Sequence, residues 1–263
     1  METLAKTGRI FYGLMITCLG AQQIPYADFR PVIFPPWSAT MPGLAVLVYL
    51  SSALLILCGL AISFEKKARE VSLILGGVFL VLILFAHVPF ELIKDPYYKH
   101  LGVWSNPLKE LVFAGGAFAI AGMYPRCEKE GGLMRFLDKF IPFAGIFTSI
   151  TMILFGVDHF LYADFVVKLM PVWIPGTLFW TYFAGVALIG AGIAIILKIK
   201  LKLSAILLGV MIFLWLIMLH IPRAIADPYG AQGNELTSVF EALGFSGVAF
   251  MLAGGYNNWK QAK

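Results

Sequence analysis

The chain has 263 residues, of which 60% are hydrophobic and 13% charged, with a formal net charge of +5. This is too little polar surface to cover a soluble globule, and the basic residues lie in short segments between apolar runs, which disfavours nucleic acid as a partner. A membrane-spanning helix needs roughly 20 apolar residues, so eight helices take about 160 residues and leave no room for a soluble domain. We therefore expect an all-α integral membrane protein whose main partner is the lipid bilayer.

Eight apolar segments follow one another along the chain. The first lies in residues 1–23 and resembles a signal peptide, because Lys6 and Arg9 precede a short apolar core. Its counterpart in the second half is an internal span, so we expect a retained helix. The other helices are expected at about 43–63, 71–92, 107–124, 141–160, 176–197, 203–221 and 236–256.

The two halves of the chain resemble each other. GAQQIPYADFRPVIFPPW, which begins at Gly20, shares its Gly, Tyr-Ala-Asp-Phe, Pro and Trp positions with GVDHFLYADFVVKLMPVW, which begins 136 residues later at Gly156. His87 and Pro89 recur as His220 and Pro222 at an offset of 133. We predict eight transmembrane helices in two parallel four-helix repeats, residues 1–125 and 141–263, joined by a cytoplasmic linker at 126–140.

The basic residues predict the orientation in the membrane. Because four helices per repeat is an even number, both termini and the linker share one face, which holds fourteen of the Lys and Arg residues against six on the other face. Positively charged loops are typical of the cytoplasmic side, so we expect both termini in the cytoplasm.

Polar residues gather near the outer ends of the predicted helices. His87 and His220 each lie eighteen residues beyond a basic residue at the inner edge, a rise of roughly 27 Å at about 1.5 Å per residue. A histidine at that depth is costly unless it has a partner or a function. The predicted ligand-binding residues, which we expect to line an outward-facing cavity between the repeats, are His87, His220, His159, Asp158, Tyr26, Tyr162, Trp37, Trp173 and Arg223.

Structural roles stay open for several of these residues. Trp37 and Trp173 are also typical of anchors at the membrane surface, and the two His-x-Pro motifs are also typical of helix kinks. We predict further that Arg223 offsets Asp158 beside His159 in one polar cluster. His87 and His220 are expected to face each other across the pseudo-two-fold axis and to line one central cavity.

Two loop-to-helix stretches carry a family resemblance. VIFPPWSATMPGLAVLVYLSSALLILCGLAI and KLMPVWIPGTLFWTYFAGVALIGAGIAI are similar to the DoxX family of bacterial membrane proteins, as is NPLKELVFAGGAFAIAG. The resemblance implies a four-helix fold per unit, a bacterial cytoplasmic (inner) membrane and, for some members, association with a redox partner subunit such as thiosulfate:quinone oxidoreductase. The acidic residue that such proteins often carry early in the second helix is absent, because Ser52-Ala53-Leu54 and Gly185-Val186-Ala187 stand there.

Three classes of function follow from these observations. The first is a redox-linked membrane subunit that holds a quinone, with haem a less favoured cofactor, because His, Tyr and Trp suit a quinone ring. The second is a transporter or binding protein for a small amphiphile, and the third is a structural subunit without a ligand. The sequence assigns no catalytic residue and leaves open whether the protein is an enzyme; we expect no metal site, and no nucleotide loop or nucleophile elbow is found in the sequence.

Overall fold

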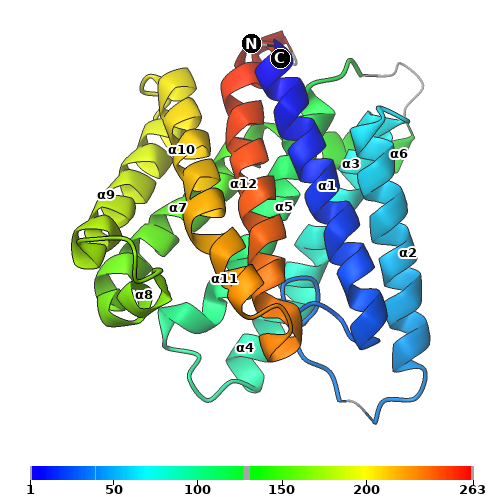
Figure 1. The fold of residues 1–263 in the computed structure, drawn as a ribbon. Helices are drawn as coiled ribbons and strands as arrows, with labels where there is room; N and C mark the ends of the chain where they lie inside the picture. Colours follow the sequence, from blue (N-terminus) through cyan, green and yellow to red (C-terminus); the bar gives the residue numbers. More distant parts are fainter. Residues whose placement is uncertain (1, 39, 127–130, 262–263) are drawn as a thin grey trace.

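The protein, seen here in a computed structural model, is all-helical over the part that the structure describes, residues 2–38, 40–126 and 131–261, with side chains up to residue 255. Figure 1 shows the long helices side by side in one bundle. The first half consists of α1 (Glu2–Tyr26), α2 (Leu44–Ser63), α3 (Ala68–Leu82), the π-helix η1 (Ile83–His87), α4 (Val88–Ile93), the 3₁₀ turn η2 (Leu101–Trp104) and α5 (Ser105–Gly122). The second half consists of α6 (Gly132–Asp138), η3 (Ile141–Phe143), α7 (Ala144–Leu161), α8 (Ala163–Leu169), α9 (Thr177–Ile196), α10 (Leu201–Trp215), the π-helix η4 (Leu216–His220), α11 (Ile221–Ala226) and α12 (Gly230–Gln261).

Six helical stretches in the described part are long and apolar enough to cross a membrane. They are Leu44–Ser63, Ala68–Ile93, Gly132–Leu161, Thr177–Ile196, Leu201–Ala226 and Gly230–Gly255. The chain is therefore an all-α membrane protein. α1 and α5 were also predicted to span, but they carry more polar residues, such as Arg9 and Gln23 on α1 and Glu110 on α5, and do not belong to this apolar set.

Two π-helical turns interrupt the long helices at matching positions. η1 ends at His87 and η4 ends at His220, and each is followed by a proline two residues later, Pro89 or Pro222. Proline lacks the N–H for the normal helical hydrogen bond, and its ring collides with the carbonyl four residues earlier, so the preceding turn widens. The predicted distortion at the His-x-Pro motifs is therefore present.

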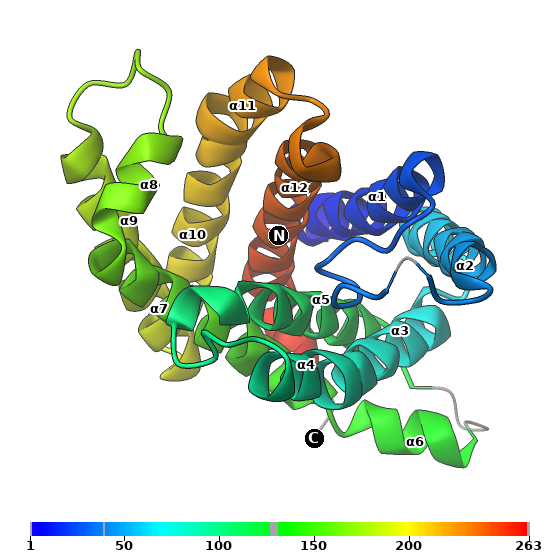
Figure 2. The same ribbon diagram turned by 90° about the horizontal axis from the view of Figure 1, so that it is seen from below.

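The long helices pack closely against one another in pairs (Figures 1 and 2). α1 packs against α2 and α12, α7 packs against α9 and α5, α3 packs on α5, and α10 packs on α12. α5 and α12 also contact each other, and their side chains fill the centre of the molecule. Small residues allow these approaches, because a Cβ at Gly247 would lie 2.5 Å from the Gly8 carbonyl oxygen, and one at Gly115 would lie 2.8 Å from that of Ala144.

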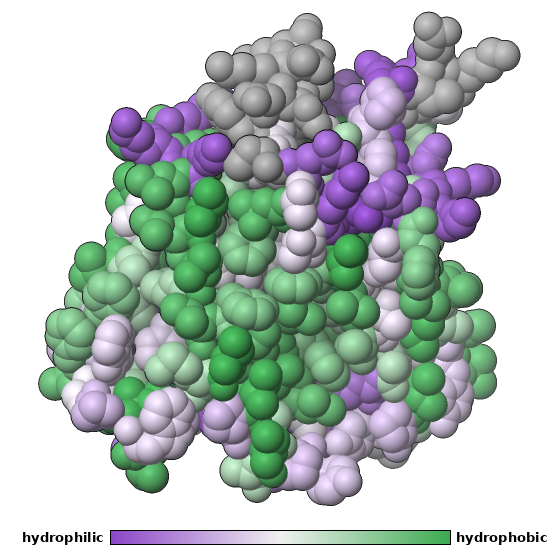
Figure 3. Space-filling model, turned by 45° about the horizontal axis from the view of Figure 1, so that its top comes forward, coloured by the Kyte–Doolittle hydropathy of each residue, from purple (hydrophilic) through white to green (hydrophobic). Residues whose placement is uncertain are grey.

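One end of the bundle is basic and holds the start of α1 and the end of α12. The hydrophilic residues form a cap at this end in Figure 3, above a largely hydrophobic side. Arg9 donates to the carbonyl oxygens of Ile62 at 2.5 Å and Ser63 at 3.0 Å, and Arg69 donates to that of Ala121 at 2.9 Å. These arginines satisfy the free carbonyls at the ends of α2 and α5, so the basic residues of this face also hold the helix ends together.

Candidate functional site

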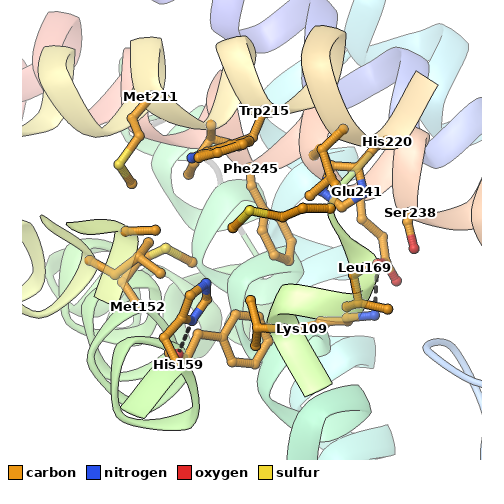
Figure 4. Close-up of a pocket in the computed structure, with 18 residues that line it drawn as sticks. Lys109, Met152, His159, Leu169, Met211, Trp215, His220, Ser238, Glu241 and Phe245 are labelled. Carbon is orange, nitrogen blue, oxygen red and sulfur yellow. Dashed lines mark hydrogen bonds and ion pairs between the residues drawn. The ribbon is translucent and has the colours of Figure 1, made fainter. Parts of the chain in front are cut away.

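A cavity that contains the two histidines His159 and His220 lies in the second half, away from the basic end. It has a volume of about 270 Å³ and is lined by residues of α7, α8, α9, α10, η4 and α12, with one side chain from α5. Figure 4 shows its apolar walls, to which Met152, Met211, Trp215 and Phe245 contribute. A largely apolar space with a few polar groups is the usual form of a small-molecule site.

Two histidines project into this cavity from different walls (Figure 4). His159, in the last turn of α7, has its Nδ1 2.7 Å from the Phe155 carbonyl oxygen. A carbonyl only accepts, so Nδ1 carries the proton and the neutral ring keeps an accepting Nε2 for another partner. His220 is the last residue of the π-helix η4 and lines the cavity from that wall.

An ion pair forms part of the cavity wall. The Lys109 ammonium on α5 lies 2.8 Å from Glu241 Oε2 on α12, and the two side chains are 22% and 5% exposed. The other oxygen, Glu241 Oε1, is buried and has no hydrogen-bond partner within the described residues. The pair therefore offers an ammonium donor and a free carboxylate oxygen at the cavity edge.

The corresponding space in the first half is filled by a loop. Val32 and Ile33, between α1 and α2, are 1% and 3% exposed and belong to the same core as Leu55 and Phe113. A turn closed by the Ile33 amide on the Arg30 carbonyl at 2.8 Å drives these side chains inward. The matching stretch in the second half, 136 residues later, forms the short helix α8 over the cavity and leaves the space open.

Polar side chains fix the filling loop in place. The Arg30 amide donates to Gln23 Oε1 at 3.2 Å, and its guanidinium donates to the Gln232 carbonyl oxygen at 2.8 Å. Gln22 Nε2 donates to the Gly233 carbonyl at 2.7 Å. Burial lowers the pKa of the Arg30 guanidinium, and the nearby Tyr26 oxygen opposes this effect. The loop is thus part of the packed core.

His87 lies in this filled half and does not line the cavity that His220 lines. Its Nε2 is 3.4 Å from Glu110 Oε2, and both side chains are completely buried. The prediction that His87 and His220 line one central cavity is therefore wrong. The two His-x-Pro motifs share only their backbone conformation. The loop that carries Val32 and Ile33 separates the two histidines from any common space.

The predicted cluster of Asp158, His159 and Arg223 is also corrected. Arg223 donates through Nε to Glu235 Oε2 at 2.8 Å, makes a second ion pair with Glu235 Oε1, and donates to the Leu169 carbonyl at 3.2 Å. Asp158 keeps a buried Oδ1 that has no partner in the described part of the chain. Arg223 pairs with Glu235 rather than with Asp158, because Glu235 lies only twelve residues away, just across the α11–α12 connection.

The remaining predicted residues lie outside the cavity. Tyr162 accepts from the Leu101 amide at 3.1 Å and stacks on His100 at 4.2 Å, which is a structural contact. Tyr26 and Trp37 border a shallow surface pocket of about 450 Å³, and Trp37 is 48% exposed, as an anchor at the membrane surface would be. Trp173 is 57% exposed beside a second, apolar groove.

Sequence reasoning missed Lys109, Glu241 and Glu110. A usable signal was present for the first two, because they occupy the same position of the two halves at an offset of 132. The pseudo-two-fold axis expected from the sequence would bring such equivalent positions face to face, and opposite charges there predict an ion pair. Among the described residues, no group of three or more His, Cys, Asp or Glu side chains could hold a metal ion.

Searches against family models, curated proteins and solved structures found no match to this chain.

Proposed function

We propose that this protein binds a small amphiphile, most simply a quinone, in the cavity of its second half, as a redox-linked subunit of a bacterial cytoplasmic membrane. The observation that carries the proposal is the combination of an apolar cavity with His159, His220 and the Lys109–Glu241 pair on its walls. The proposal includes an eight-helix architecture built from two four-helix units of the DoxX type.

The two-unit architecture is supported by contacts that occur twice. The Gly8–Gly247 approach of α1 to α12 has its counterpart in Ala144 and Gly115 of α7 and α5, at the repeat offsets of 136 and 132. The second half also repeats the first in its long segments, because α3, η1 and α4 have the same lengths as α10, η4 and α11. In this architecture the first helix of each unit packs on the last helix of the other unit, so α1 and α5 belong to the membrane bundle.

The contact between α1 and α2 is repeated in the same way. A Cβ at Gly59 would lie 2.5 Å from the Gly13 carbonyl oxygen, and a Cβ at Gly192 would lie 2.9 Å from the Ser149 carbonyl oxygen. Ser149 and Gly192 follow Gly13 and Gly59 at offsets of 136 and 133. Matching contacts in helices with so little sequence identity are difficult to explain without a common unit.

A quinone suits the polar groups of the cavity. Its flat ring packs against Met and aromatic side chains, and its two carbonyl oxygens accept hydrogen bonds from separate donors. Lys109 supplies an ammonium, and an imidazole on another wall supplies a donor when its tautomer changes or when it is protonated. His159 and Glu241 can also accept the protons of a quinol hydroxyl, so the same groups hold both redox forms.

Transport or storage of a small amphiphile is the second candidate. It is favoured by the open second half and the filled first half, because a carrier needs a site but no electron-transfer group of its own. Haem is less favoured because His87, one of the two histidines predicted as ligands, is sealed beside Glu110.

A bound-ligand measurement tests the proposal. Protein purified in lipid nanodiscs is released in a native mass spectrometer, and the organic extract is analysed for quinones. We expect a quinone in the wild-type extract and a several-fold lower content in His159→Ala. His100→Ala is the matched control, since His100 is exposed and lies outside the cavity. An extract without any quinone or other amphiphile would refute the proposal.

A further inference from the structure

A second, strongly apolar groove runs along the outside of the second half. It lies between α9 and α10, has a volume of about 760 Å³, and extends from Trp173 at one end to Ser204 at the other. Measured along α10 and η4, Ser204 and Met218 are fourteen residues apart, or about 21 Å at the α-helical rise. That is roughly two-thirds of the hydrocarbon thickness of a bilayer.

Small residues keep this groove open. α9 lines it with Ala187, Gly190 and Ala191, and a Cβ added at Gly190 would meet no atom within 4 Å. The corresponding positions of α2, 133 residues earlier, are Leu54, Leu57 and Cys58. The first half therefore has bulk at the places where the second half has space.

The groove and the polar cavity share two residues. Met211 and Trp215 of α10 line both, so the two spaces adjoin at these side chains. Trp215 also packs edge-to-face on Trp180 of α9, with ring centroids 6.3 Å apart, and this contact bridges the groove at its outer part.

We propose that the α9–α10 groove holds the hydrocarbon chain of the ligand whose polar head occupies the cavity, with Met211 and Trp215 at the junction. This inference rests on the proposed function and narrows the ligand to an amphiphile with one long isoprenoid or alkyl chain. The ligand enters sideways from the bilayer, because the groove faces lipid along its length. In the first half the corresponding positions of α2 carry the larger side chains Leu54 and Leu57, and Ile33 is packed in the core.

The energetics define what the groove can do. The chain is already in apolar surroundings when it is dissolved in lipid, so transfer into the groove yields no hydrophobic gain of the kind found in water. The groove instead selects ligands by van der Waals packing against the hydrocarbon chain. It also gives the chain a path that does not collide with the helices while the head is bound. Filling the groove should therefore weaken the binding of long-chain ligands and leave the binding of a chainless head group unchanged.

The test uses a benzoquinone with a diazirine on a long alkyl chain, photolysed in nanodiscs, with a chainless benzoquinone as competitor. We expect labelling on α9 and α10 that falls when the competitor is added. Gly190→Leu should weaken binding of the long-chain probe about tenfold, because overfilling forces the chain out, and should leave the chainless compound within about twofold. Leucine improves helix propensity over glycine, so the variant should fold.

Ala53→Leu is the matched control, because it adds the same side chain to an exposed position of α2 in the first half and should change nothing. If labelling of α9 and α10 does not fall when the competitor is added, the inference is overturned, since the groove would then bind ordinary lipid chains. Competitor-sensitive labelling of other helices would also overturn it, but would leave the proposed function standing. Failure of the chainless compound to quench Trp215 fluorescence at all would refute the proposed function itself.

Discussion

The Lys109–Glu241 pair offers a quantitative test of how the two halves are joined beside the cavity. Lys109→Met leaves a carboxylate that is only 5% exposed without its partner, and removal of one member of a buried ion pair costs about 3–5 kcal/mol. Because Lys109 itself is 22% exposed, we expect the low end of that range, about 3 kcal/mol. The free energy of unfolding is measured by SDS titration in mixed micelles, followed by tryptophan fluorescence.

The double variant Lys109→Met/Glu241→Met separates the charge effect from the packing effect. It replaces both charges with apolar side chains of similar size, so we expect stability within about 1 kcal/mol of wild type. Lys6→Met breaks the exposed Lys6–Glu2 pair and should have no measurable effect. A double variant as unstable as the single one, or a single variant that loses less than about 1 kcal/mol, would refute the buried pair.

Two further predictions concern the filled half and the orientation. Ile33→Ala should cost about 3 kcal/mol because it empties a packed site, whereas Leu169→Ala, at the matching position beside the open cavity, should cost about 1 kcal/mol; equal losses in the same titration would contradict the difference between the halves. Reporter fusions at Glu130 and Lys263, both outside the described residues, should score cytoplasmic, and one after Gly230 should score external; a split between the first two would contradict the parallel two-unit architecture.

Helix positions could be predicted from the sequence because membrane helices are marked by long apolar runs. The segment predicted at 43–63 is α2 at Leu44–Ser63, and the one predicted at 176–197 is α9 at Thr177–Ile196. The proline rule also located the distortions before Pro89 and Pro222. These features depend on local chemistry, which the chain itself carries.

The site was harder to predict because it depends on how loops pack. Ile33 and Leu169 are both apolar loop residues at matching positions, and nothing local says that one enters the bundle while the other lies over a cavity. The sequence predicts that Arg223 pairs with Asp158, although Glu235 is nearer to Arg223 along the chain and is its partner in the structure. Ion pairs between helices can be predicted only when the packing of the helices is known.

The most direct test of the central claim is the number of ligands bound per chain. Native mass spectrometry of the protein in nanodiscs saturated with a long-chain quinone should give one quinone per chain, because His220 lines a cavity of the described structure whereas His87 is buried beside Glu110. His220→Ala should abolish this binding, and His87→Asn, in the filled half, should retain it in the fraction that is folded by gel filtration. Two quinones per chain, or loss of binding in His87→Asn with retention in His220→Ala, would contradict the account.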